Sequence, residues 1–347
     1  MGYNHALILR GLELLSTWRS DVIHARDWLV AQAAVGLQTV LATDERPVQL
    51  VTNMHATEAG RHQGWLPGRL NRSIPQIEWR LTQHSDGVVV CSEHMREEIN
   101  QIFEPDPTAM DVIGNGVHVL AWRSTPTQTL AARQRWQPAA AAPLLVHSGR
   151  LEWEKGSHTL VAAMPRLRWQ FPGIKLVIAG KGSQSDAWAQ QCKRLRLGRS
   201  VELTGWVHDD ELATLLGCAD AVVLPSLYEP FGLVALEAAA SGTPLVVART
   251  GGLAEFVRDK ANGMTFTPGD PLALADAVTA VLNDPSGAQA RAERALDTLA
   301  QHHTCDGVAR DVAVVYQQAV PRAHRGPGDT PEHLLAALLS GRNLLRH

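Results

Sequence analysis

Two glutamates, Glu229 and Glu237, lie on either side of seven mostly apolar residues in the run Y-E-P-F-G-L-V-A-L-E-A (228–238). The apolar stretch before Glu229 predicts a buried strand, and the run itself predicts a short helix ending at Ser241-Gly242. A carboxylate on an apolar surface is costly unless it is paired or faces a polar crevice. Ligands of open α/β sheets bind beyond the carboxyl ends of the strands. The pair therefore indicates a polar ligand site there.

Two cations are expected in the same crevice. Arg150 follows the strand that ends in H-S-G, and Lys155 precedes the helix that opens at Gly156. Fixed cations beside helix amino-termini favour binding of a diphosphate. The alternative is that both cations are solvated or paired with Glu152 and Glu154.

Two glycine-containing turns lack the third glycine of a dinucleotide fingerprint. They are Gly180-Lys181-Gly182 and Gly114-Asn115-Gly116. A nicotinamide or flavin site is therefore not predicted. The Gly180 loop either contacts a base or ribose or is a plain turn.

His55 and Asp27 follow strands in the first half of the chain and are expected to face the same kind of crevice. The chain has 15 histidines, so a structural or exposed role is the alternative for His55. For Asp27 the alternative is a simple helix cap.

Other chemistries lack support in the residue pattern. The sequence contains no D-x-D, no H-x-x-x-H and no G-x-S-x-G. We therefore predict no metal site, no bound cofactor and no serine hydrolase chemistry. Asp209-Asp210-Glu211 is interpreted as the first turn of a helix, where acidic residues are favoured.

The elements that position these residues alternate between short apolar runs and helical patterns, which is typical of doubly wound parallel α/β sheets. A chain of 347 residues suits two such domains. The predicted strands are 21–25, 48–52, 87–91, 111–113, 144–147, 174–179, 201–203, 221–224, 244–248 and 264–266. We predict a first domain over 1–122, a linker over 123–143, a second domain over 144–304, and over 305–347 helices that return to the first domain, plus a tail.

The composition is that of a cytoplasmic globular protein. The net charge is −3 without a long basic run, which argues against a nucleic-acid partner. The four cysteines are far apart and are expected to be reduced. No apolar run is long enough for a membrane span, and the first twenty residues predict an amphipathic helix rather than a signal peptide.

The sequence resembles the retaining glycosyltransferases of family 4, with bacterial glycogen and α-glucan synthase-like glucosyltransferases the most similar. In the second half the resemblance lies in S-G-R-L-E-W-E-K-G (148–156), P-S-L-Y-E-P-F-G-L-V-A-L-E-A-A-A-S-G-T-P-L-V-V (225–247) and Gly251-Gly252. In the first half it lies in H-A-R-D-W-L (24–29), T-N-M-H-A-T-E-A-G-R-H-Q-G-W-L-P (52–67) and I-G-N-G-V (113–117). The resemblance implies a GT-B fold, in which two Rossmann-like domains face a cleft.

The resemblance also implies a role for individual residues. Arg150 and Lys155 would hold the donor diphosphate, Glu237 the ribose hydroxyls, and Glu229 the sugar hydroxyls. His55 would contact the transferred sugar. The implied catalytic set is His55, Glu229, Arg150 and Lys155; the donor contacts are Gly149, Arg150, Lys155, Gly180, Trp206, Val207, Glu229, Phe231, Gly232, Leu233 and Glu237; the acceptor side is Asp27, His55 and Asn115.

The implied reaction moves a hexose from a nucleotide-diphosphate sugar, with UDP-glucose or ADP-glucose as first choice and GDP-mannose as the alternative. The acceptor would be a glycan, a lipid or a small molecule. Two other functions stay open: a catalytically weak homologue that binds a nucleotide sugar or a partner, and a sugar-nucleotide 2-epimerase.

Relatives begin with strands and a glycine-rich loop before the helix that begins this chain, so we expect a truncated first domain. A sheet without its usual strands exposes surface that is normally covered. We expect self-association, or contact of the amphipathic start and the apolar segment 334–339 with the cytoplasmic face of a membrane or with a partner.

Overall fold

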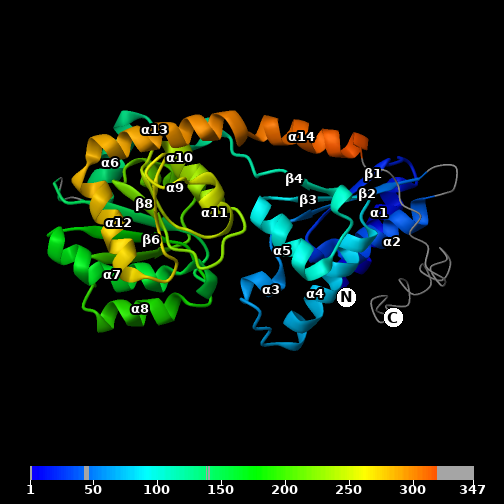
Figure 1. The fold of residues 1–347 in the computed structure, drawn as a ribbon, viewed down its shortest axis with the longest axis horizontal. Helices are drawn as coiled ribbons and strands as arrows, with labels where there is room; N and C mark the ends of the chain where they lie inside the picture. Colours follow the sequence, from blue (N-terminus) through cyan, green and yellow to red (C-terminus); the bar gives the residue numbers. More distant parts are fainter. Residues whose placement is uncertain (1, 43–46, 138, 140, 319–347) are drawn as a thin grey trace. The chain divides into compact units, whose positions relative to one another are not determined.

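The computed structural model describes residues 2–42, 47–137, 139 and 141–318 (Figure 1). It divides into two compact units. The first contains the described residues up to Ile113 together with those from Ala309 onward, and the second runs from Gly114 to Val308. The predicted apolar segment 334–339 lies outside the described residues.

The first unit is built on a four-stranded parallel sheet in the order β1-β2-β3-β4. Its strands are β1 (Val22–Arg26), β2 (Gln49–Met54), β3 (Gly87–Val90) and β4 (Met110–Val112). Its helices are α1 (Gly2–Leu15), η1 (Trp28–Val30), α2 (Ala31–Leu41), α3 (Glu58–Arg61), α4 (Arg69–His84), α5 (Glu93–Phe103) and η2 (Pro107–Ala109).

Helix capping and β-branched residues explain the local structure of this unit. The Ser92 hydroxyl accepts a hydrogen bond from the Met95 amide at 3.1 Å and caps α5. Val88, Val89 and Val90 are buried in β3, as expected for a parallel strand covered on both faces.

The second unit is built on a six-stranded parallel sheet in the order β10-β9-β8-β5-β6-β7. Its strands are β5 (Leu144–Ser148), β6 (Lys175–Ala179), β7 (Val201–Gly205), β8 (Ala221–Leu224), β9 (Leu245–Ala248) and β10 (Met264–Phe266). Its helices are η3 (Val119–Trp122), α6 (Pro126–Trp136), η4 (Trp153–Lys155), α7 (Ser157–Gln170), α8 (Ser185–Arg194), α9 (Asp209–Gly217), α10 (Leu233–Ser241), α11 (Gly251–Phe256), α12 (Pro271–Asn283) and α13 (Pro285–His302), followed by α14 (Cys305–Gln318).

The helices of the second unit cover its sheet on two sides. Helix α7 contacts both α8 and α12, and the three helices build the main core against the sheet with side chains such as Leu160, Met164 and Trp188. Helix α10 contacts α9 and α13 (Figure 1). This arrangement confirms the predicted α/β class with two Rossmann-like parallel sheets.

The boundaries between the two units differ from the predicted domain boundaries. The stretch 123–143, expected to be a linker, contains α6, which begins with a capping box formed by Thr125 and Gln128. The first unit ends at Ile113 rather than at residue 122. The second boundary falls inside α14, and Val315 of this helix packs on Val51 and Val89 of the first sheet.

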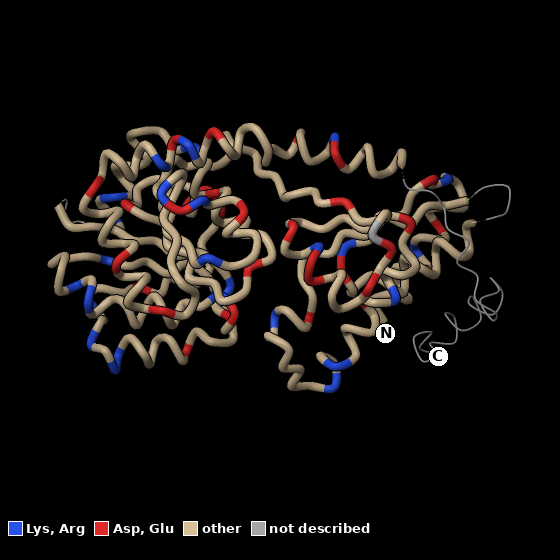
Figure 2. The backbone as a smooth tube through the Cα atoms, viewed as in Figure 1, with Lys and Arg blue, Asp and Glu red and all other residues tan. Residues whose placement is uncertain are grey.

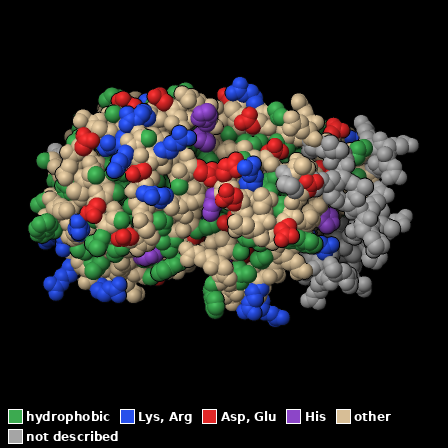
Figure 3. Space-filling model, in the orientation of Figure 1, with side chains coloured by type: hydrophobic (Ala, Val, Ile, Leu, Met, Phe, Trp, Pro, Cys, Tyr) green, Lys and Arg blue, Asp and Glu red, His purple; other side chains and the backbone are tan. Residues whose placement is uncertain are grey.

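Positions of basic and of acidic residues are spread over both units along the backbone (Figure 2), and basic residues are interspersed with acidic ones on the face drawn in Figure 3. Within the described residues, the helices fall short of the length and hydropathy needed to cross a membrane. The four cysteines are free thiols.

Candidate functional site

Strand order in the second unit creates a switch point between β5 and β8. These strands are neighbours, and the chain runs outward from them in opposite directions, through β6 and β7 on one side and through β9 and β10 on the other. The two loops that meet at this point are 149–156 and 225–232. Ligands of open parallel sheets bind at such a switch point.

Lys155 and Glu229 come from these two loops and form an ion pair. Lys155 Nζ donates to Glu229 Oε2 at 2.6 Å, and the two side chains are 18% and 14% exposed. The Ser226 hydroxyl donates to the same carboxylate oxygen at 3.0 Å. The amides of Leu227 and Tyr228 donate to the Glu154 carbonyl, which ties the loops together through the backbone. The predicted convergence of an acid and a base is therefore present for this pair.

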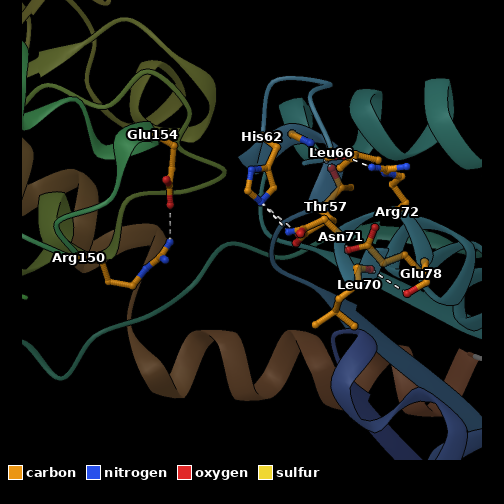
Figure 4. A network of polar contacts seen from close by, with 12 residues as sticks. Thr57, His62, Leu66, Leu70, Asn71, Arg72, Glu78, Arg150 and Glu154 are labelled. Carbon is orange, nitrogen blue, oxygen red and sulfur yellow. Dashed lines mark hydrogen bonds and ion pairs between the residues drawn. The ribbon is translucent and has the colours of Figure 1, made fainter. Parts of the chain in front are cut away.

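Arg150 is paired with Glu154, at 2.8 Å between Nη2 and Oε1 (Figure 4). This is the pairing that the sequence left open as an alternative to a diphosphate site. The Arg150 side chain is 55% exposed. Because exposed ion pairs contribute only about 0–1 kcal/mol, the guanidinium is available to an anionic ligand.

Close backbone approaches explain two glycines of this site. A Cβ on Gly156, whose φ is 65°, would lie 1.9 Å from the Pro225 carbonyl oxygen. A Cβ on Gly180, whose φ is 147°, would lie 1.9 Å from the carbonyl oxygen of Gly149. Only glycine fits these positions, so the loops after β5, β6 and β8 pack backbone against backbone.

Helix α10 begins at this edge of the sheet. Gly232 precedes it with a φ of 99°, and Leu233 is its first residue. The Gly252 amide donates to the Glu229 carbonyl at 3.0 Å, and its Cα packs against the backbone of Phe231. A Cβ on Gly232 would lie 3.5 Å from Glu229 Cγ, so the amino-terminus of α10 lies beside Glu229.

Glu237 lies inside α10, as predicted. Burial, together with the charge of Asp209, raises the pKa of its carboxyl from 4.5 to about 7. Within the described residues, no hydrogen bond or ion pair joins it to Arg150, Lys155 or Glu229. The structure therefore brings Lys155 and Glu229 into contact, pairs Arg150 with Glu154 of the same loop, and leaves Glu237 as a partly buried acid without a hydrogen-bond partner among the described residues.

Trp206 and Val207 follow β7. The Gly180 amide donates to the Gly205 carbonyl at 2.8 Å, so the turns after β6 and β7 are adjacent. The Trp206 side chain is 65% exposed, whereas Val207 is buried. This places an exposed indole and a backbone turn on the β7 side of the switch point.

His147, a buried residue of β5, was not predicted to belong to the site. Its Nδ1 lies 3.0 Å from the Val223 carbonyl oxygen of β8, and its Nε2 lies 2.8 Å from the Ser157 hydroxyl of α7. Burial lowers its pKa to about 4. A histidine inside an otherwise apolar strand is the signal that could have identified it. Its neutral ring links the two strands under the Lys155 loop.

In the first unit, Asp27 and His55 are in contact. Asp27 Oδ1 accepts from the His55 amide at 2.8 Å, and Oδ2 lies 3.1 Å from His55 Nδ1. The alternative of a helix cap is wrong, because the Asp27 side chain makes no cap bond to η1. Its φ of 55° turns the chain so that the carboxylate meets His55 instead.

A second histidine of this edge was also missed. His24 Nε2 lies 2.6 Å from Asn53 Oδ1, and its Nδ1 lies 2.6 Å from the Tyr316 hydroxyl. Burial lowers its pKa. Tyr316 belongs to α14, about 290 positions away along the chain, so no local pattern indicates this contact.

Asn115 is not part of the same unit as Asp27 and His55. Asn115 falls within the predicted first domain (1–122), but the second unit begins at Gly114. The Val117 amide donates to the His303 carbonyl at 3.0 Å, and this contact holds the 114–117 turn in the second unit. The described residues include no group of three or more His, Cys, Asp or Glu side chains placed to hold a metal ion.

The chain folds into two Rossmann-like parallel-sheet units, and the second unit has a ligand site at its switch point. This is the GT-B fold of enzymes that use nucleotide sugars. The family model described as "Glycosyltransferase Family 4" matches residues 1–119, and the one described as "Glycosyl transferases group 1" matches residues 129–297. The chain belongs to this glycosyltransferase family.

Individual relatives agree with this assignment. A glycogen synthase of Mycobacterium tuberculosis (strain H37Rv) is 43% identical over 332 residues, which cover 94% of this chain and 77% of that protein. An uncharacterized glycosyltransferase of Methanocaldococcus jannaschii is 32% identical over 89% of this chain and 78% of that protein. The structure of Anabaena HepE in complex with UDP-glucose matches with a TM-score of 0.78 at 23% identity, over 89% of this chain and 81% of that one, and shows a common fold.

Proposed function

We propose that this glycosyltransferase moves glucose from a nucleotide-diphosphate sugar to an α-glucan, with retention of the anomeric configuration and without a metal ion. The observation that carries the proposal is the Lys155–Glu229 pair at the switch point between β5 and β8. A cation for the diphosphate and an acid for the sugar hydroxyls are held there on adjacent loops.

The proposed chemistry breaks the bond between C1 of the sugar and the diphosphate oxygen, whose electrons leave with the diphosphate. Negative charge therefore grows on the leaving group while positive charge grows on the sugar ring. Lys155, Arg150 and the first-turn amides of α10 would stabilise the diphosphate without a metal ion. The acceptor hydroxyl would attack from the same face and pass its proton to the departing phosphate oxygen.

The other candidate residues fit this donor. Glu237 is partly buried and has no hydrogen-bond partner in the described part of the chain, which suits an acceptor of hydrogen bonds from the two ribose hydroxyls. Trp206 and Val207 would contact the base, with Gly180 beside them. In the first unit, Asp27 would orient the His55 imidazole toward the transferred sugar and the acceptor.

Two relatives support the choice of substrates. The 43% identical relative is a glycogen synthase, which favours an α-glucan acceptor. The structure of HepE in complex with UDP-glucose favours a glucose donor. A lipid or small-molecule acceptor and GDP-mannose as the donor are the alternatives.

The test is to incubate the protein with UDP-, ADP- and GDP-linked sugars, with and without glycogen, and to measure release of free nucleotide diphosphate. We expect release from a glucose donor that depends on glycogen and persists in EDTA. NMR of the product should show an α-linked glucose. A glycosyl-enzyme adduct trapped by mass spectrometry would contradict same-face attack, and loss of activity in EDTA would contradict metal independence.

The same assay separates the alternatives. A weak homologue would bind donor without glycogen-dependent release, and a sugar-nucleotide 2-epimerase would change the sugar without an acceptor.

Self-association and contact with a membrane are separate proposals. Exposed apolar side chains on and just after α1, such as Leu14 and Trp18, support them. A monomeric mass in light scattering at micromolar concentration, with no lipid binding, would contradict both.

A further inference from the structure

The four residues that follow β2, residues 55–58 (the His55 segment), are held by carboxyl groups from three different elements. Asp27, after β1, accepts from the His55 amide at 2.8 Å. Glu98, from α5, accepts from the Thr57 hydroxyl at 2.5 Å. The third carboxyl comes from α4 and holds the end of the segment.

That third carboxyl belongs to Glu78, which is 1% exposed. Its Oε1 accepts a hydrogen bond from the Glu58 amide at 3.0 Å, at the first residue of α3 (Figure 4). Its Oε2 is buried and has no hydrogen-bond partner within the described residues. Glu78 thus uses one oxygen to hold the backbone of the His55 segment and keeps the other in the interior.

Glu78 is a neutral acid near pH 7. Burial raises its pKa from 4.5 to about 8. The hydrogen bond from the Glu58 amide and the charge of Arg61 lower the pKa, and the charges of Glu58 and Asp27 raise it by smaller amounts than burial does. A neutral carboxyl accepts a hydrogen bond at one oxygen and carries a proton on the other, as the amide of glutamine does with its oxygen and NH2 group. Glutamine is therefore its chemical mimic at this position.

A buried carboxyl that forms no ion pair contributes little to the free energy of unfolding, because its burial is costly. A leucine here would remove the cost of burying the carboxyl but would leave the Glu58 amide without its acceptor, so the two effects on the free energy of unfolding oppose each other. The bond to the Glu58 amide, in contrast, fixes where α3 begins and hence the path of the preceding three residues. Thr57 is held from the other side, since it also accepts from the Gly60 amide at 2.9 Å.

We propose that Glu78 is a positioning residue for the transfer reaction, which from α4 fixes the His55 segment and through it the orientation of the His55 imidazole against Asp27. The inference rests on the proposed function, in which His55 meets the transferred sugar. Glu78 itself is not expected to touch the substrate, because it is buried beneath the start of α3.

The first test compares Glu78→Gln and Glu78→Leu. The glutamine variant should keep kcat within about threefold of the parent protein, because it keeps the acceptor and the donor. The leucine variant should lose about 10- to 100-fold in kcat with little change in the KM for the donor, because a shift of about 1 Å in a catalytic group has that effect. Its melting temperature should fall only slightly, because the Glu58 amide loses its acceptor while the cost of burying the carboxyl is also removed, and kcat is therefore expressed per folded protein. Glu97→Leu, at an exposed position of α5, is the control and should change neither.

The second test does not depend on turnover. Histidine side-chain NMR spectra of the 15N-labelled protein, assigned for His55 with a His55→Gln variant, should show the His55 signals shifted in Glu78→Leu and unchanged in Glu78→Gln. If the parent protein released no nucleotide diphosphate from any donor, the proposed function would fail while this test would still decide the position of His55.

The inference is overturned if Glu78→Leu keeps both the parent kcat and the parent His55 signals. It is also overturned if both Glu78 variants lose activity in proportion to a loss of folded protein, since that would show a purely structural role. Should the leucine variant not fold, Glu78→Met places a more adaptable apolar side chain at the site, and the same two outcomes apply.

Discussion

The Lys155 ammonium lies 2.6 Å from the Glu229 carboxylate, although the two residues are 74 positions apart in the chain. Neighbouring strands β5 and β8 bring their loops together, and the Ser226 hydroxyl holds the same carboxylate. The site therefore holds a cation and an acid in direct contact. A diphosphate sugar would take the cation and leave the carboxylate for sugar hydroxyls.

We predict that Lys155→Ala and Glu229→Gln each reduce release of nucleotide diphosphate by at least about 100-fold, the usual loss when one stabiliser of developing charge is removed. The measurement is steady-state turnover with a saturating donor. Lys193→Ala, at an exposed lysine of α8, is the matched control and should retain activity. Unchanged turnover in both site variants would rule out this site.

Glu237 should make donor binding depend on pH. Its pKa of about 7 means that the carboxylate proposed to bind the ribose is lost as the pH falls below 7. The KM for the donor should therefore rise from pH 8 to pH 6 in the parent protein. In Glu237→Gln the KM should be about 10- to 100-fold higher, because a hydrogen bond to a charged group is lost, and it should be flat over this range. A parent profile as flat as that of the variant would contradict the assignment.

The same shift has a stability consequence with a defined sign. Because the folded pKa lies above the ordinary value of 4.5, the native state holds more protons than the unfolded state between pH 4.5 and about 7. The contribution of Glu237 to the free energy of unfolding should therefore fall as the pH rises through this window. Urea denaturation should show Glu237→Gln more stable than the parent protein at pH 8, with the difference shrinking toward pH 4.5.

His147 should have the opposite effect. Burial lowers its pKa from 6.5 to about 4, so the unfolded state binds more protons between these values. Its contribution to stability is complete above pH 6.5 and is lost as the pH falls toward 4. In His147→Gln, the drop in urea midpoint between pH 7 and pH 4.5 should shrink by the equivalent of about 2–3 kcal/mol. An equally steep drop in both proteins would refute this account.

Gly156→Ala should destabilise the second unit and its site. Its Cβ would meet the Pro225 carbonyl oxygen at 1.9 Å, at a φ of 65°. We expect a loss of about 2 kcal/mol or more in the free energy of unfolding and lower activity, because the β5 and β8 loops must separate. Gly198→Ala is the control: its Cβ would meet nothing within 4 Å, and a change within about 0.5 kcal/mol is expected.

Much of the fold follows from local sequence. Runs such as Val88-Val89-Val90 and Ala221 to Leu224 form strands as predicted, and Ser92 caps α5 through a contact with a residue only three positions away. Helix α6 was missed because its Thr, Gln and Ala residues lack an apolar stripe, and its capping box was the better signal.

The sequence by itself determined the class of fold, the strand positions and the residues that follow each strand, because apolar periodicity and turn chemistry are properties of neighbouring residues. Tertiary structure decided the partners. Lys155 pairs with Glu229 rather than with an adjacent acid, and Arg150 pairs with Glu154. His24 contacts Tyr316, and Asn115 belongs to the second unit. These choices depend on strand order and on the return of α14, which bring together residues far apart in the chain.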